Sequence, residues 1–152
     1  MAITRANVEA TLIKRLGQKM TAAGLDGTTF SGSNTDLNDP IGMALRTIGV
    51  CVPDISLVTN SDLSGVTGDQ IDALLDIAEL RTLQNISGNL TAVDQSIGPR
   101  DMSLNQLSNQ VEKAIERLTE YIAKVHGYGI GSLDAGTISL DFQEKPSDMI
   151  DA

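Results

Sequence analysis

The chain has 152 residues, of which 41% are hydrophobic, 20% charged and 3% aromatic, a balance typical of one globular domain with an aliphatic core. Its 11 Lys and Arg against 20 Asp and Glu give a formal net charge of -9, which argues against a protein that grips the phosphates of nucleic acid. No run approaches the roughly 18 to 20 apolar residues that span a bilayer, so we expect a soluble protein made in the cytoplasm, with no membrane partner.

Two amphipathic helices are predicted in the first third of the chain. The first begins after Thr4, a good N-cap, and runs to about Ala23, where Gly24 ends it. Residues 25–38 are rich in Gly, Ser, Thr, Asn and Asp and predict a loop. Asp39 followed by Pro40 then predicts an N-cap with proline at the first helical position, opening a helix that ends near Gly49.

The middle and the end of the chain predict two longer helices. After a short turn at 61–65, the spacing of Thr67 and Gln70 is that of a capping box and opens a helix over about 68–87 that Gly88 stops. Residues 89–98 form a connector, and the longest helix runs from near Pro99 to about His126, with apolar positions close to a heptad seam. Both helices carry more apolar surface than one core contact requires. The fold class is therefore all-α, a small bundle of about four helices with a long C-terminal helix.

The last 26 residues differ from the rest. Gly127, Gly129 and Gly131 break the long helix and form a candidate hinge, and residues 127–152 are expected to be an extended arm outside a helical domain at 1–126. Within the arm, apolar and polar residues alternate, which predicts a short β-strand. This strand either pairs with another subunit or folds against its own domain. Its candidate contact residues are Thr137, Ile138, Leu140 and Phe142.

Few residues offer covalent chemistry. The single histidine, His126, is expected to cap a helix C-terminus or face solvent, and the single cysteine, Cys51, is expected to be a small buried hydrophobe. The glycine run at 127–131 follows a helix, whereas phosphate-binding loops lead into one. We therefore expect no enzyme, no catalytic or cofactor-binding residue and no metal ligand.

One charge pattern stands out on the third predicted helix. Four acidic residues spaced 3, 4 and 3 apart lie on one stripe of its surface. The stripe is either a solvated face, or a surface that must not adhere to a polyanion, or a site for a divalent cation. Its members are Asp69, Asp72, Asp76 and Glu79.

Four strings of the sequence resemble small head-to-tail adaptor (connector) proteins of tailed bacteriophages. They are DIAELRTLQNI at 76–86, NTDLNDPIGMALRTIG at 34–49, VDQSIGPR at 93–100 and LSNQVEKAIERL at 107–118. The resemblance covers roughly residues 4–126. It implies a mainly helical protein without covalent chemistry that assembles, typically as a dodecamer, into a ring beneath the portal protein in the virion neck.

On this interpretation the ring extends the DNA channel and docks the next neck or tail protein, while DNA passes without specific binding. The acidic stripe becomes a candidate channel lining, because carboxylates repel phosphates. The strand at 137–142 becomes a candidate for addition to a neighbour's sheet edge. Two alternatives are an α-helical protein-binding module, monomeric or dimeric, and a small metal-dependent hydrolase that uses the acidic stripe.

Overall fold

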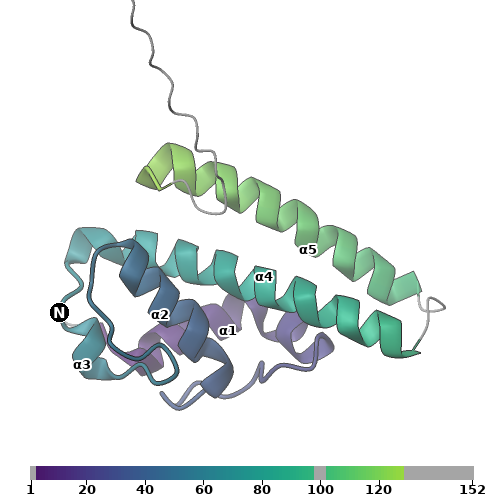
Figure 1. Ribbon diagram of the computed structural model, residues 1–152, viewed down its shortest axis with the longest axis horizontal. Helices are drawn as coiled ribbons and strands as arrows, with labels where there is room; N and C mark the ends of the chain where they lie inside the picture. Colours follow the sequence, from purple (N-terminus) through teal and green to yellow (C-terminus); the bar gives the residue numbers. More distant parts are fainter. Residues whose placement is uncertain (1–2, 98–101, 129–152) are drawn as a thin grey trace, which may run out of the picture.

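The computed structural model describes residues 3–97 and 102–128, and within them the protein is all-α. Helix α4 (Ile71–Ile97) lies in the middle of the body (Figure 1). Helices α1 (Arg5–Ala22) and α2 (Asn38–Thr47) pack on one side of α4, and the antiparallel helix α5 (Met102–Tyr121) packs on the other. A one-turn helix, α3 (Asn60–Leu63), lies in the connection from α2 to α4. The predicted fold class is thus confirmed for the described residues, whereas the strand at 137–142 lies outside them.

Helix α1 has the ends that the sequence predicts. Thr4 Oγ1 accepts a hydrogen bond from the backbone N–H of Asn7 at 3.2 Å, as an N-cap does. At the other end, Gly24 has a φ of 83°, which allows the N–H of Leu25 to bond the carbonyl of Met20 at 2.8 Å. The apolar face between these ends is fully used in the core.

The start of α2 differs from the prediction. A 3-10 turn, η1 (Thr35–Leu37), precedes the helix, and the side chain of Asn34 rather than Asp39 provides the cap, by accepting from the N–H of Asp36 at 3.0 Å. Asp39 instead lies in the first turn of α2, where its carboxylate accepts from Arg81 Nε at 2.8 Å. The loop therefore supplies its own helix start, and Asp39 ties α2 to α4.

The capping box at Thr67 is confirmed, because the N–H of Thr67 donates to Gln70 Oε1 at 3.1 Å and opens a 3-10 turn, η2 (Gly68–Gln70), that leads into α4. The predicted stop at Gly88 and the connector at 89–98 are wrong, since α4 continues to Ile97. A glycine inside a helix costs about 1 kcal/mol. Burial of Ile86 and Leu90 on either side of it, at 0% and 2% exposure, offsets that cost.

The wide apolar surface of α4 is buried within a single chain. The sequence predicted more apolar surface on this helix than one core contact requires, and α1, α2 and α5 cover it from both sides. The buried apolar side chains of α4 are Ala73, Leu74, Ile77, Ala78, Leu80, Leu83, Ile86 and Leu90. This surface is therefore not available for contacts between subunits.

Helix α5 ends in a π-helical turn, η3 (Ile122–His126), close to the predicted end of the last helix. Gly127 follows with a φ of 79°, and its N–H bonds the carbonyl of Ile122 at 3.0 Å, so the glycine does end the helix. Gly129 and Gly131, the other two residues of the predicted hinge, lie outside the described residues. None of the helices in the described ranges combines the length and the apolar character that crossing a membrane requires.

Candidate functional site

The predicted acidic stripe falls into two parts with different surroundings. Asp69 and Asp72, at the start of α4, are exposed. Asp69 accepts a hydrogen bond from the hydroxyl of Thr67 at 2.6 Å, and this bond, followed by one from its own backbone N–H, lowers the pKa of Asp69 below its ordinary value. This part of the stripe is negatively charged and faces solvent.

The other part of the stripe is paired with cations. Arg15 on α1 donates to Glu79 Oε1 at 2.7 Å and to Asp76 Oδ1 at 3.3 Å. Burial alone would lower the pKa of Arg15, but the hydrogen bonds and negative charges of Glu79 and Asp76 outweigh it and raise that pKa. Because one guanidinium serves two carboxylates, Arg15, Asp76 and Glu79 together keep a single formal negative charge, against two for Asp69 and Asp72.

His126 also meets the stripe, contrary to the expectation of a helix cap or a solvent-facing side chain. Its Nε2 lies 2.8 Å from Asp76 Oδ2, and its side chain is only 14% exposed. Tyr121 stands edge-on to the imidazole, with ring centroids 5.8 Å apart. The end of α5 is thus fastened to α4 at the point where the C-terminal segment begins. Sequence periodicity could not reveal this contact, because 50 residues separate the two partners.

A buried polar network that the sequence did not predict holds α1, α2 and the adjoining loops together. Arg5 and Glu9, at i and i+4 on α1, are 3% and 0% exposed. Arg5 Nε lies 2.6 Å from Glu9 Oε2 in an ion pair that is not aligned as a hydrogen bond. The two terminal nitrogens of Arg5 donate at 2.6 Å to Asn38 Oδ1 and to the carbonyls of Val58 and Asn34. One guanidinium therefore joins α1, α2 and two loops.

Glu9 completes this network on the loop that precedes α2. Its carboxylate accepts from the N–H groups of Gly32 at 2.8 Å and of Asn34 at 3.1 Å. Asn34 in turn donates through Nδ2 to the carbonyls of Asp26 and Thr29, each at 2.9 Å. The polar loop at 25–38 is thus a fixed structure, in which buried backbone groups find partners. The only hint in the sequence is the pairing of Arg5 with Glu9 one turn later.

Two exposed apolar side chains lie on the loops that this network fixes. Phe30 is 57% and Leu57 is 62% exposed. A shallow hollow of about 290 Å³ lies beside Leu57 and is lined by Arg5, Ala6, Ser31, Gly32, Leu57, Val58, Thr59 and Asn60. Asp26, in the same loop as Phe30, has its pKa lowered to about 2 by hydrogen bonds from Thr29 and then Thr28.

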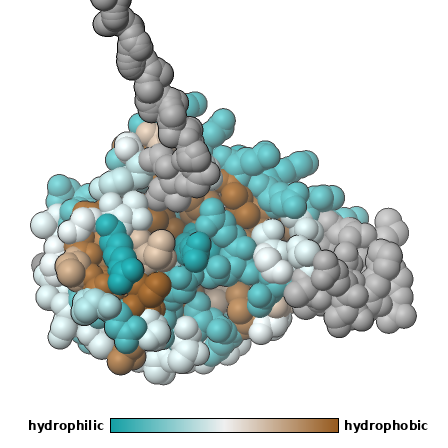
Figure 2. Space-filling model, in the orientation of Figure 1, coloured by the Kyte–Doolittle hydropathy of each residue, from teal (hydrophilic) through white to brown (hydrophobic). Residues whose placement is uncertain are grey.

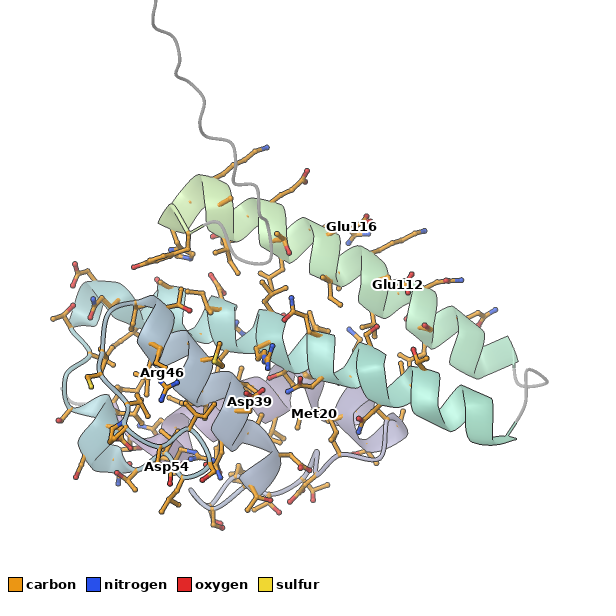
Figure 3. All side chains as sticks on the ribbon, in the orientation of Figure 1. Met20, Asp39, Arg46, Asp54, Glu112 and Glu116 are labelled. Atoms are coloured by element: carbon orange, nitrogen blue, oxygen red, sulfur yellow. The ribbon has the colours of Figure 1, made fainter. Side chains whose placement is uncertain are left out.

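The second pair of large exposed apolar side chains lies at the end of α5. Tyr121 is 49% and Val125 is 57% exposed, and they are one turn apart. The outer surface of α5 is otherwise mostly hydrophilic (Figure 2). Glu112 and Glu116 lie on the side of α5 away from α4 (Figure 3).

Cys51 is exposed, so the expectation of a buried small hydrophobe was wrong. Its neighbour Val52 is 3% exposed and is held by Arg46, whose Nη2 donates to the carbonyl of Val52 at 2.7 Å. Val52 is turned into the core, and the adjacent Cys51 is left at the surface. No group of three or more His, Cys, Asp or Glu side chains that could hold a metal ion occurs in the part of the chain that the structure describes.

Comparison with known proteins does not place the chain in a family. No protein-family model matches it, and no curated protein or solved structure is significantly similar to it. Its function is therefore inferred from its residues and their arrangement.

Proposed function

We propose that this protein is a structural adaptor in the neck of a tailed bacteriophage. On this proposal, twelve or a similar number of copies form a ring beneath the portal protein, extend the DNA channel and dock the next neck or tail protein. The proposal rests mainly on the four strings of the sequence that resemble such adaptors. Three of them lie on η1 and α2, on α4 and on α5, and these helices pack in one body with α4 between α2 and α5. The resemblance thus concerns the packed framework of the protein.

The charge of the protein supports a channel role. A formal net charge of -9 disfavours adhesion to DNA, since binding to nucleic acid depends on Lys and Arg that displace counterions. Asp69 and Asp72 are exposed and together are the best candidates for a surface that repels phosphates. Asp76 and Glu79 fit this role less well, because Arg15 neutralises one of their two charges. We therefore narrow the candidate channel lining to the first turn of α4 and the turn before it.

The C-terminal segment supplies the proposed docking element. Ile138, Leu140 and Phe142 alternate with polar residues, as in a strand that adds to the sheet edge of another protein. His126 fastens the end of α5 to α4 and so sets the point from which this segment departs. The proposed location is the virion neck, after synthesis in the host cytoplasm.

A reconstruction of the assembled virion by electron microscopy tests the proposal. The expected result is a ring of this chain directly beneath the portal, with the first turn of α4 facing the channel. A chain found outside the neck, or one that acts in the cell as a monomer or dimer on another protein, would contradict it.

Truncation after Gly131 tests the docking element separately. We expect the truncated chain to fold but to enter necks poorly. A full-length variant with Ile138, Leu140 and Phe142 all changed to Asn is the matched control for chain length, and it should fail in the same way. Undiminished neck assembly with either variant would show that residues 132–152 are not the clamp.

A further inference from the structure

The exposed surface of α5 has two different edges. Only one face of α5 packs on α4, along a line marked by the buried Val111 and Ile122. At 100° per residue along α5, Tyr121 lies to one side of this line, whereas Ile115 and Thr119 lie to the other. Val125 follows one turn after Tyr121 in the π-helical turn η3 and continues the side of Tyr121. Tyr121 and Val125 thus form an exposed apolar edge beside the contact with α4. Ile115 and Thr119 lie on the opposite edge.

The charges of α5 are segregated in the same way. Two bases of α5 lie on the side of Tyr121, and three acids lie on the side of Ile115 and Thr119 or at the outermost position, as the spacing of the residues requires. A third base follows in the π-helical turn η3. All six side chains are exposed. The bases are Lys113, Arg117 and Lys124, and the acids are Glu112, Glu116 and Glu120.

The outer surface of α5, from the acidic edge to Arg117, is also hollowed. A surface depression of about 410 Å³ is lined by Ile115, Glu116, Arg117, Thr119 and Glu120. Ile115 and Thr119 form one i, i+4 ridge and Glu116 and Glu120 form the next, and the groove between two such ridges can receive a side chain, as a knob, from a neighbouring helix. Tyr121 is a knob of suitable size. It lies about 5 Å along the helix axis from the middle of the depression, at 1.5 Å per residue.

We propose that neighbouring copies of this chain associate through α5, with Tyr121 and Val125 of one copy seated in the depression of the next. Glu112 and Glu116 of the second copy then face Arg117 and Lys124 of the first. The occupant is a second copy because the two edges of α5 are complementary to each other in shape and charge. One edge of one copy therefore fits the opposite edge of another copy. The contact joins two different surfaces, and such head-to-tail contacts form rings when their rotation closes. The inference thus rests on the proposed ring and identifies the faces that build it.

The contact is expected to be weak in isolation. Two half-exposed apolar side chains and surface ion pairs, which individually contribute little, make a small interface. Association should therefore depend on concentration and weaken as salt screens the charges.

Charge reversal tests the contact in solution. One variant carries Glu112→Lys and Glu116→Lys, and the other carries Arg117→Glu and Lys124→Glu. Self-association of the full chain is measured by sedimentation and native mass spectrometry up to millimolar concentration. Each variant alone should bring like charges together and raise the dissociation constant by about 100-fold. The variant Lys14→Glu, on the exposed surface of α1, is the control and should associate like the original chain.

Mixing the two variants is the decisive step. In the mixture every contact again joins an acidic to a basic edge, so association should return with the variants in equal amounts. A second test, Tyr121→Ser with Val125→Ser, should abolish association at all salt concentrations, and circular dichroism verifies that each variant remains helical.

The outcomes separate this inference from the proposed function. A closed oligomer that ignores all these substitutions would overturn the α5 contact and leave the ring intact. A two-fold dimer that persists in both charge variants would overturn it as well. A chain that stays monomeric at every concentration would also overturn it. The virion reconstruction would then decide whether the protein forms a ring in the neck.

Discussion

The two sides of α4 are held by different kinds of interaction. On one side α1, α2 and two loops surround a buried polar network centred on Arg5 and Glu9. On the other side α5 packs on α4 along one face, and between residues 106 and 128 only Val111 and Ile122 are fully buried. On the first side most apolar side chains are buried, with Phe30 and Leu57 as exceptions. On the second side, within the described residues, α5 exposes side chains along both edges of its contact with α4.

This difference has a physical consequence for stability. A buried network is cooperative, because losing one member leaves the others without partners in a medium of low dielectric constant. A helix held along one apolar line can separate from the body at a lower free energy than the body needs to unfold. We therefore expect the α1 and α2 side to respond sharply to single substitutions and the α5 side to respond gradually.

The largest expected effect comes from breaking the buried ion pair. Glu9→Ala removes the acceptor of two backbone N–H groups and leaves the charge of Arg5 buried without its partner. The free energy of unfolding should fall by about 3 to 5 kcal/mol in a denaturant titration. Glu112→Ala on the exposed surface of α5 is the matched control and should change it by less than about 0.5 kcal/mol.

The double variant Arg5→Met, Glu9→Leu sharpens this test. It removes both charges, so its loss of stability should be smaller than the sum of the losses caused by Arg5→Met alone and by Glu9→Leu alone. Additive losses would show that the two residues do not act as a unit.

Leucine truncation compares the two sides directly. Leu12 on α1 is fully buried, whereas Leu118 on α5 is partly exposed. Leu12→Ala should lower the free energy of unfolding by about 2 to 5 kcal/mol. Leu118→Ala should lower it by about half as much, because the side chain of Leu118 buries less apolar area on folding. Hydrogen exchange should also show faster exchange at α5 amides in the Leu118 variant while α1 stays protected. Equal losses would mean that α5 is as integral to the core as α1.

A glycine on the first side shows how closely its parts approach. Gly17 lies in the interior of α1, and a Cβ placed there would be 2.7 Å from the carbonyl oxygen of Gly27 in the neighbouring loop. Gly17→Ala should therefore lower stability by about 1 to 3 kcal/mol, although alanine favours the helix itself. Thermal unfolding measures this. A stabilised variant would show that the loop can move aside.

The sequence predicted what depends on local pattern and missed what depends on distant partners. The ends of α1, the capping box at Thr67 and the last helix follow from neighbouring residues, and each was found. The contact of His126 with Asp76 and the buried pairing of Arg5 with two loops join residues far apart in the chain. Spacing along one helix likewise placed the four acids on one stripe. It could not show that Arg15 pairs with half of them.

The smallest expected effect concerns Gly88, the residue wrongly predicted to end a helix. It lies exposed inside α4, has no positive φ, and a Cβ there would meet no atom within 4 Å. Gly88→Ala should therefore stabilise the protein by about 0.5 to 1 kcal/mol, since alanine restricts the unfolded chain and favours the helix. With Gly17→Ala it forms a matched pair that exchanges the same two residue types inside a helix and differs only in what surrounds the new methyl group. Opposite signs in the two unfolding experiments would show that tertiary contact decides which glycines this protein needs, whereas a loss of stability at both sites would contradict a continuous α4 through Gly88.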